Sequence, residues 1–122
     1  MKSVDELLAQ MVAADASDLH IKADSPPVMR VDGGLSVLEG EPLTSEHTKD
    51  YAASLMSDRQ IRRFSETNEI DFAYSAPAIG RFRVNVFRQR GSISIAVRQV
   101  VGKIPTFEKL MLPDAVRKLA LE

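Results

Sequence analysis

The chain has 122 residues with a formal net charge of −1, and it contains no cysteine. This length is enough for one domain with a hydrophobic core, and its 44% of hydrophobic residues is ordinary for a soluble globular protein. Without cysteine, the chain can form no disulfide, no thiolate metal site and no cysteine nucleophile. No apolar run approaches the roughly 18 residues of a membrane span, and no secretory signal pattern is present, so we expect a cytoplasmic protein.

The charge is distributed unevenly along the chain. Residues 1–58 hold 11 acidic and 4 basic side chains, a net −7, whereas residues 59–122 hold 6 acidic and 12 basic side chains, a net +6. Such a split predicts either that one half docks on the other or that a basic face meets an anionic partner. With five Phe, two Tyr and no run of five Lys or Arg residues, the sequence gives a nucleic-acid partner little support, and we expect none.

The N-terminal half predicts a helix followed by short strands. Ser3 and Glu6 have the spacing of a capping box, which opens a helix with apolar residues at helical intervals. Three strands are then expected, bounded by Pro26-Pro27 and by the turn Asp32-Gly33-Gly34, at Asp18–Lys22, Val28–Val31 and Leu35–Leu38. His20 points outward from the first of these strands, and a single His without a second metal ligand nearby favours a structural role.

Two helices and a further strand are expected next. Thr44 or Ser45 caps the first helix, and Ser57 with Gln60 forms a capping box for the second. Glu69 to Tyr74 then alternates as a strand. Together with the strands on either side, this pattern predicts helices and strands that belong to one domain.

The stretch from Gly80 to Val100 predicts two adjacent strands with a turn at Arg90-Gly91. The apolar faces of the two strands coincide only if the loop holds an even number of residues. A two-residue loop places Arg83 opposite Arg98, whereas a four-residue loop places Arg98 opposite Arg81, with Arg83 on the diagonal. Either register gathers three arginines in one patch, where like charges destabilise a sheet.

Two features could offset this repulsion between arginines. An anion is the functional alternative, and phosphate fits best because guanidinium groups bind it with planar, bidentate geometry. The structural alternative is that Glu69 and Asp71, on the preceding strand, lie on the same face and neutralise the arginines. Spacing alone leaves both alternatives open.

Five collinear motifs give the chain a resemblance to a known family. It resembles the N-terminal domain of the twitching-motility type IV pilus retraction ATPases, which belong to the secretion ATPase superfamily. The pilus assembly ATPases and type II secretion ATPases of the same superfamily are the alternative. The motifs are Ala16-Ser17-Asp18-Leu19-His20-Ile21, Pro27-Val28-Met29-Arg30-Val31-Asp32-Gly33, Glu69-Ile70-Asp71-Phe72, Arg81-Phe82-Arg83-Val84-Asn85 and Phe107-Glu108-Lys109-Leu110 before Leu112-Pro113.

The resemblance implies an organisation for the whole protein. Residues 1–101 would form a single PAS-like α+β domain, with an antiparallel sheet and flanking helices. Residues 102–122 would form a linker and short helix leading to a RecA-like ATPase domain outside these 122 residues. The full protein would assemble as a hexamer and act with the pilus machinery at the cytoplasmic side of the inner membrane. No Walker A sequence occurs in the chain, so ATP and Mg²⁺ would belong to the full-length protein. We therefore expect the chain alone to bind no cofactor or metal and to hydrolyse no ATP.

The resemblance also assigns roles to the arginines. It implies that Arg83 and Arg98 contact nucleotide phosphate in the hexamer, with Arg81 as a candidate third contact. The domain would thereby contribute to nucleotide sensing, ring assembly and domain rotation. A stand-alone PAS-like small-molecule sensor is the alternative from another functional class, although the sequence has no flavin-binding Cys and no Trp.

Overall fold

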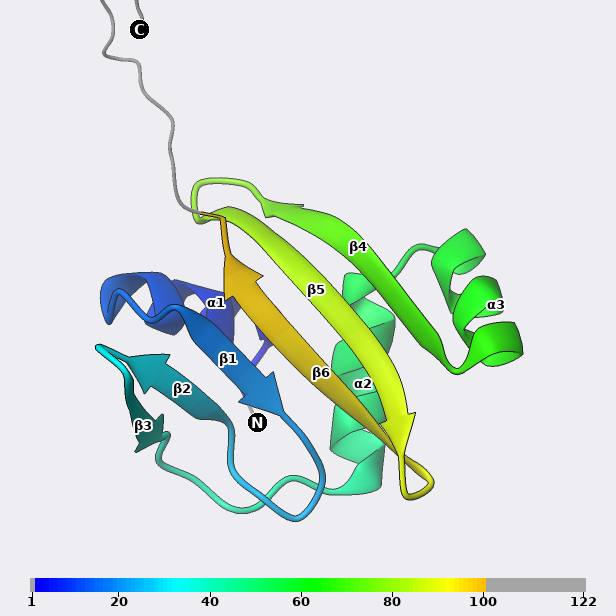
Figure 1. Ribbon diagram of the computed structural model, residues 1–122, viewed down its shortest axis with the longest axis horizontal. Coiled ribbons are helices and arrows are strands. Elements are labelled where there is room, and N and C mark those ends of the chain that lie inside the picture. Colours follow the sequence, from blue (N-terminus) through cyan, green and yellow to red (C-terminus); the bar gives the residue numbers. More distant parts are fainter. Residues whose placement is uncertain (1, 101–122) are drawn as a thin grey trace, which may run out of the picture.

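The computed structural model describes residues 2–100, which form a six-stranded antiparallel sheet with three helices (Figure 1). The strand order is β3-β2-β1-β6-β5-β4, so β1 lies between β2 and β6 and joins the two halves of the chain. The linker and short helix expected at 102–122 lie outside the described residues. The strands are β1 Asp18–Ile21, β2 Val28–Val31, β3 Gly34–Val37, β4 Glu69–Ala76, β5 Gly80–Gln89 and β6 Ser92–Gln99.

The helices are α1 Val4–Ala13, α2 Ser45–Leu55 and α3 Asp58–Thr67. Each begins at a capping box, in which an N-cap hydroxyl accepts a hydrogen bond from the third helical N–H. The caps are Ser3, Thr44 and Ser57, so the structure selects Thr44 over Ser45 for α2. None of the helices within residues 2–100 is long and apolar enough to span a bilayer.

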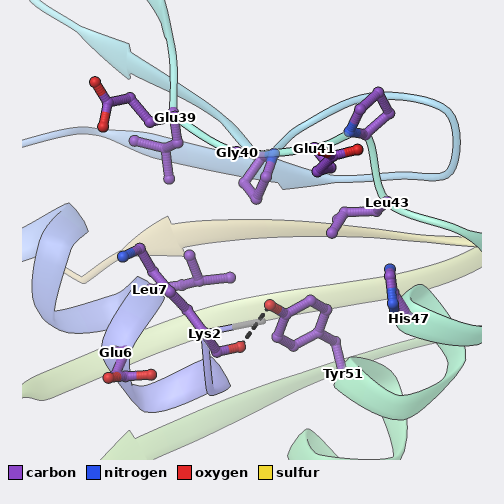
Figure 2. Close-up of a pocket in the computed structure, with 12 residues that line it drawn as sticks. Lys2, Glu6, Leu7, Glu39, Gly40, Glu41, Leu43, His47 and Tyr51 are labelled. Atoms are coloured by element: carbon purple, nitrogen blue, oxygen red, sulfur yellow. Dashed lines mark hydrogen bonds between the residues drawn. The ribbon is translucent and has the colours of Figure 1, made fainter.

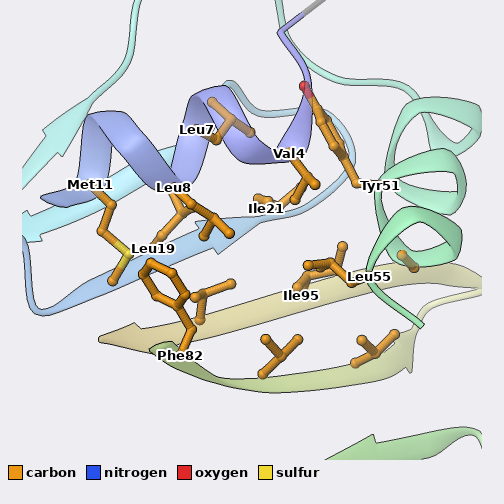
Figure 3. Close-up of a cluster of buried hydrophobic side chains, with 14 of the residues drawn as sticks. Val4, Leu7, Leu8, Met11, Leu19, Ile21, Tyr51, Leu55, Phe82 and Ile95 are labelled. Atoms are coloured by element: carbon orange, nitrogen blue, oxygen red, sulfur yellow. The ribbon is translucent and has the colours of Figure 1, made fainter. Parts of the chain in front are cut away.

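The hydrophobic core lies between one face of the sheet and the helices α1 and α2 (Figure 3). Leu8 and Met11 of α1 are fully buried, and they share the core with Phe82 of β5 and Ile95 of β6. The opposite face carries the other alternating set of side chains, and no helix of the described part covers it (Figure 1). The structure therefore confirms the expected single α+β domain and leaves one sheet face open.

Some strand boundaries differ from the prediction. The third strand begins and ends one residue early because Asp32 and Gly33, both at positive φ, form a two-residue turn that pairs Val31 with Gly34. Leu38 leaves the strand, is buried, and donates its backbone N–H to the Pro27 carbonyl at 2.9 Å. The first strand ends one residue early, at Ile21, and β4 continues past Tyr74 to Ala76 because its pairing with β5 extends to Gly80.

We predict that Ser57→Ala destabilises the domain by about 1 kcal/mol, which lowers its Tm by about 4 °C. The substitution removes the hydroxyl that accepts from the Gln60 N–H at 3.2 Å and leaves that donor without its partner. Thermal melting of the chain measures the effect, with Ser54→Ala as control because the Ser54 hydroxyl only donates to the Asp50 carbonyl within α2. Equal Tm values for the two variants would contradict the proposed contribution of this cap.

Candidate functional site

The β5–β6 hairpin places two arginines directly opposite each other. The strands are joined by Arg90 and Gly91, both at positive φ, and the register pairs Arg83 with Arg98. The structure thus selects the two-residue loop, and the four-residue alternative is wrong. Arg81 is also exposed on β5, but it lies two positions before Arg83, near the start of the strand, and pairs with Ser75 of β4.

The open face of the sheet is arranged in two cross-strand rows. We define the first row, from β3 to β4, as Leu35, Arg30, Asp18, Arg98, Arg83 and Ala73. The second row, in the same strand order, is Val37, Val28, His20, Ala96, Asn85 and Asp71. Charged side chains occupy the middle of the first row, and the β3 end of both rows is apolar.

Each of the two opposed arginines lies beside one carboxylate. Arg83 Nη2 donates to Asp71 Oδ1 at 3.0 Å, and both side chains are more than half exposed. Arg98 Nε lies 3.6 Å from Asp18 Oδ1, while Arg30 Nε lies 3.9 Å from Asp18 Oδ2. Asp18 is therefore shared between two arginines, and its side chain is only 20% exposed. These contacts draw Arg83 and Arg98 towards opposite sides of the hairpin.

The carboxylate pairing agrees only partly with the sequence-based alternative. Asp71 does pair with Arg83, as predicted, but Glu69 pairs with neither arginine and instead accepts from Asn85 Nδ2 at 3.3 Å. The reason is register: Glu69 lies opposite Phe87, two pairs away from Asp71 along the strand. The partner of Arg98 is Asp18, which the sequence analysis missed.

A hollow of about 330 Å³ lies on this face above Ala96. Ala96 is the smallest side chain in the middle of the second row, so the space above it stays open between longer neighbours. Its polar lining comes from four strands and comprises Asp18, His20, Asp71, Arg83, Asn85 and Arg98. Because each guanidinium has five N–H donors, each arginine retains donors beyond those facing its carboxylate. Within residues 2–100, no cluster of three or more His, Asp or Glu side chains is placed to hold a metal ion.

A larger pocket of about 550 Å³ lies on the helix side of the sheet (Figure 2). Leu7 and Tyr51, from α1 and α2, line it together with Leu43. The Tyr51 hydroxyl donates to the Lys2 carbonyl at 2.5 Å, and burial, reinforced by the nearby Glu6 carboxylate, raises the pKa of Tyr51. This pocket contains none of the arginines that the sequence analysis selected.

The chain is similar to pilus ATPases over nearly its whole length. Over 117 residues, 96% of the chain, it is 42% identical to the type IV pilus ATPase PilU and 33% identical to the type IV pilus retraction ATPase PilT, both of Pseudomonas aeruginosa. The crystal structure of the pilus retraction motor PilT with bound ADP matches with a TM-score of 0.79 and 38% identity, over 93% of this chain and 34% of that one. No family model matches the chain.

These matches confirm the resemblance inferred from the five motifs, and they confirm the fold expected from it. The chain spans only about a third of the curated relatives, 31% of PilU and 34% of PilT. The chain is therefore similar, over about a third of their length, to the PilT-like type IV pilus ATPases, and it fits the N-terminal domain of such a protein.

Proposed function

We propose that this domain presents Arg83 and Arg98 to the phosphate groups of a nucleotide held by a RecA-like domain in a hexameric, PilT- or PilU-type pilus ATPase. One observation carries the proposal. The two arginines are directly paired across adjacent strands, on a sheet face that no helix of the described part covers. They also line the same hollow above Ala96.

The energetics of this face favour the exchange of carboxylate for phosphate. Exposed ion pairs such as Arg83–Asp71 contribute only about 0–1 kcal/mol, because water and salt screen both charges. This pair therefore holds Arg83 weakly, Arg98 shares the carboxylate of Asp18 with Arg30, and the directly opposed like charges still repel. A phosphate group carries more charge than a carboxylate and accepts bidentate hydrogen bonds from guanidinium groups. Bound between Arg83 and Arg98, it would relieve their repulsion and replace the pairs with Asp71 and Asp18.

The relatives supply the wider setting of the proposal. Their names describe type IV pilus ATPases, and the PilT structure contains ADP. We accordingly assign ATP and Mg²⁺ to a RecA-like domain of the full-length protein. Neighbouring subunits of a hexamer and the pilus machinery at the cytoplasmic side of the inner membrane are its proposed partners. The arginines would then couple nucleotide state to ring assembly and domain rotation.

A small-molecule sensor is the second candidate, and the pocket beside Tyr51 is the observation that favours it. Its volume of about 550 Å³ lies within the range of about 300–1,000 Å³ that ligand pockets occupy. Native mass spectrometry of the purified chain distinguishes the candidates. A small organic ligand retained at one equivalent would support the sensor, whereas we expect the mass of the chain alone.

We predict that the purified 122-residue chain hydrolyses no ATP. The reason is that the sequence contains no Walker A phosphate loop, which would have to hold the nucleotide and position Mg²⁺. A steady-state phosphate-release assay checks this, with a full-length protein that contains the chain as the positive control. Turnover that persists at constant specific activity through several purification steps would contradict the prediction.

We predict that Arg83→Gln and Arg98→Gln leave the stability of the isolated chain nearly unchanged but strongly lower the ATP turnover of the full-length protein. In the isolated chain, each change should alter the free energy of unfolding by less than about 1 kcal/mol. The Arg83–Asp71 pair is exposed, Asp18 keeps Arg30 beside it when Arg98 is replaced, and either change removes the repulsion between the two arginines. In the full-length protein, each should lower ATP turnover by about 10³-fold, the effect of removing an arginine that stabilises phosphoryl transfer. Thermal melting and phosphate release measure the two quantities.

Arg62→Gln is the matched control for these two variants, because Arg62 is an exposed arginine on α3 rather than on the open sheet face. It should change neither stability nor turnover. A purely structural role for Arg83 and Arg98 would give the reverse pattern, with clear destabilisation of the isolated chain and normal turnover in the full-length protein. That pattern would refute the proposed phosphate contact.

A further inference from the structure

Helix α3 carries a group of exposed arginines that the proposed function does not use. Arg59, Arg62 and Arg63 are all exposed, and their spacing of three and four residues places them on one side of the helix. Arg88 of β5 is also exposed and adds a fourth guanidinium beside the helix, because it lies 5.0 Å from the centroid of the Phe64 ring. We call these four arginines the α3 basic surface.

The other side of α3 holds the helix to the sheet. Phe64 is 3% exposed and belongs to the hydrophobic core, and Arg88 Nε donates to Oδ1 of Asn68, the residue that caps the end of the helix, at 2.9 Å. The strand that α3 packs against is β4, which ends the sheet on the side opposite β3 (Figure 1). The helix therefore lies at the rim of the domain, where a flat surface can reach its arginines.

These arginines have no ion-pair partner within residues 2–100. The ion pairs of this part of the chain all belong to the open sheet face. The acidic residues of α3 are Asp58 and Glu66, so four arginines face two carboxylates, an excess of two positive charges. Arg59 and Arg63 also lie four residues apart, and like charges at that spacing destabilise a helix. Exposed, unpaired and mutually repelling cations are typical of a surface that meets an anionic partner.

The α3 basic surface has the charge for an anionic partner but lacks the apolar groups that anchor a protein or a single-stranded nucleic acid. Protein interfaces are centred on buried apolar or aromatic side chains. On α3 the exposed large hydrophobic residue is Ile61, at only 37%, and the aromatic Phe64 is buried and so cannot stack on a base. A lipid bilayer needs no such anchor, because its anionic headgroups attract arginine by charge.

We infer that the α3 basic surface binds the anionic headgroups of a phospholipid bilayer. The inference rests on the proposed location at the inner membrane, but not on the phosphate contact of Arg83 and Arg98. Clusters of roughly four or more basic residues on an amphipathic helix are typical of binding to anionic lipids. In a hexamer, the surface would be repeated in every subunit, so that weak contacts add up. Because the affinity is spread over many headgroups, a single free phosphate should bind the surface only weakly.

Flotation of the full-length protein with lipid vesicles tests the inference. Vesicles of phosphatidylethanolamine in which about one third of the lipid is phosphatidylglycerol supply the anionic surface, and vesicles of phosphatidylcholine supply a neutral one. The parent should float with the anionic vesicles alone. Each arginine near such a surface contributes roughly fivefold, so replacing Arg59, Arg62 and Arg63 together with Gln should raise the lipid concentration for half-maximal binding by at least about 100-fold.

The matched control replaces Lys2, Lys22 and Lys49 together with Gln. These lysines are exposed and take part in no ion pair of residues 2–100, and the net charge changes by the same amount. The control should float like the parent. Thermal melting of the isolated chain checks folding, and the Tm of the arginine variant should stay equal or rise slightly. Gln is nearly as good a helix former as Arg, and the repulsion between Arg59 and Arg63 is removed.

Three results would overturn the inference. If the parent does not float with anionic vesicles, or floats equally with neutral ones, no anionic lipid is bound, and an acidic protein surface becomes the better partner. If the lysine control loses binding as strongly as the arginine variant, net charge alone decides and α3 has no special part. If inorganic phosphate releases the protein from vesicles more effectively than sodium chloride of equal ionic strength, the surface holds a single phosphate ion instead of a bilayer.

The outcomes distinguish this inference from the proposed phosphate contact. Arg83→Gln should lower ATP turnover and still float, and the turnover assays contain no lipid, so the α3 basic surface does not enter them. If Arg83→Gln turns over normally while the α3 triple variant stays off the vesicles, the lipid contact stands and the phosphate contact is wrong. If the triple variant floats like the parent while Arg83→Gln loses turnover, the reverse holds.

Discussion

The antiparallel pairing of β1 with β6 is the contact on which the rest of this domain depends. It joins the first three strands to the last three in one continuous sheet, and it places Asp18 directly opposite Arg98. Without it, the acidic N-terminal half and the basic C-terminal half would be two small, incomplete sheets. The charge asymmetry of the sequence is thus partly internal, because the Asp18–Arg98 pair links one half to the other.

The same pairing gives the two faces of the sheet different roles. On one face, Leu19 and Ile21 enter the core beneath α1 and α2, and this burial stabilises the fold. On the other face, the alternate residues Asp18 and His20 border the hollow above Ala96. The repulsion between Arg83 and Arg98 on the open face therefore lowers the stability of the domain only modestly, since that stability comes from the covered face.

Local patterns in the sequence predicted most of the secondary structure. Capping boxes at Ser3 and Ser57 marked two helix starts, and alternation with Arg90-Gly91 as turn predicted the hairpin. The loop length of that hairpin stayed open because two-residue and four-residue loops both align the apolar faces. In the structure the loop has two residues, and both have positive φ angles.

The contacts that the sequence could not predict are those between distant segments. Strand alternation showed that Asp18 points outward, but nothing local indicated that β1 would lie beside β6 rather than beside β4. The carboxylate beside Arg98 was missed for that reason, and Glu69 was wrongly paired because the β4–β5 register was unknown. The exposure of Leu35 and Val37 was hidden in the same way, since alternating apolar residues normally indicate a buried face.

We propose that Arg83 and Arg98 exchange their carboxylates for one shared phosphate group. Titrating the isolated chain with inorganic pyrophosphate while recording the arginine Nε–H resonances by NMR tests it most directly. We expect the signals of Arg83 and Arg98 to shift together and to saturate at one common pyrophosphate concentration, while that of Arg62 stays in place. Equal shifts at every arginine, or no shift at Arg83 and Arg98 up to concentrations that saturate nonspecific sites, would contradict it.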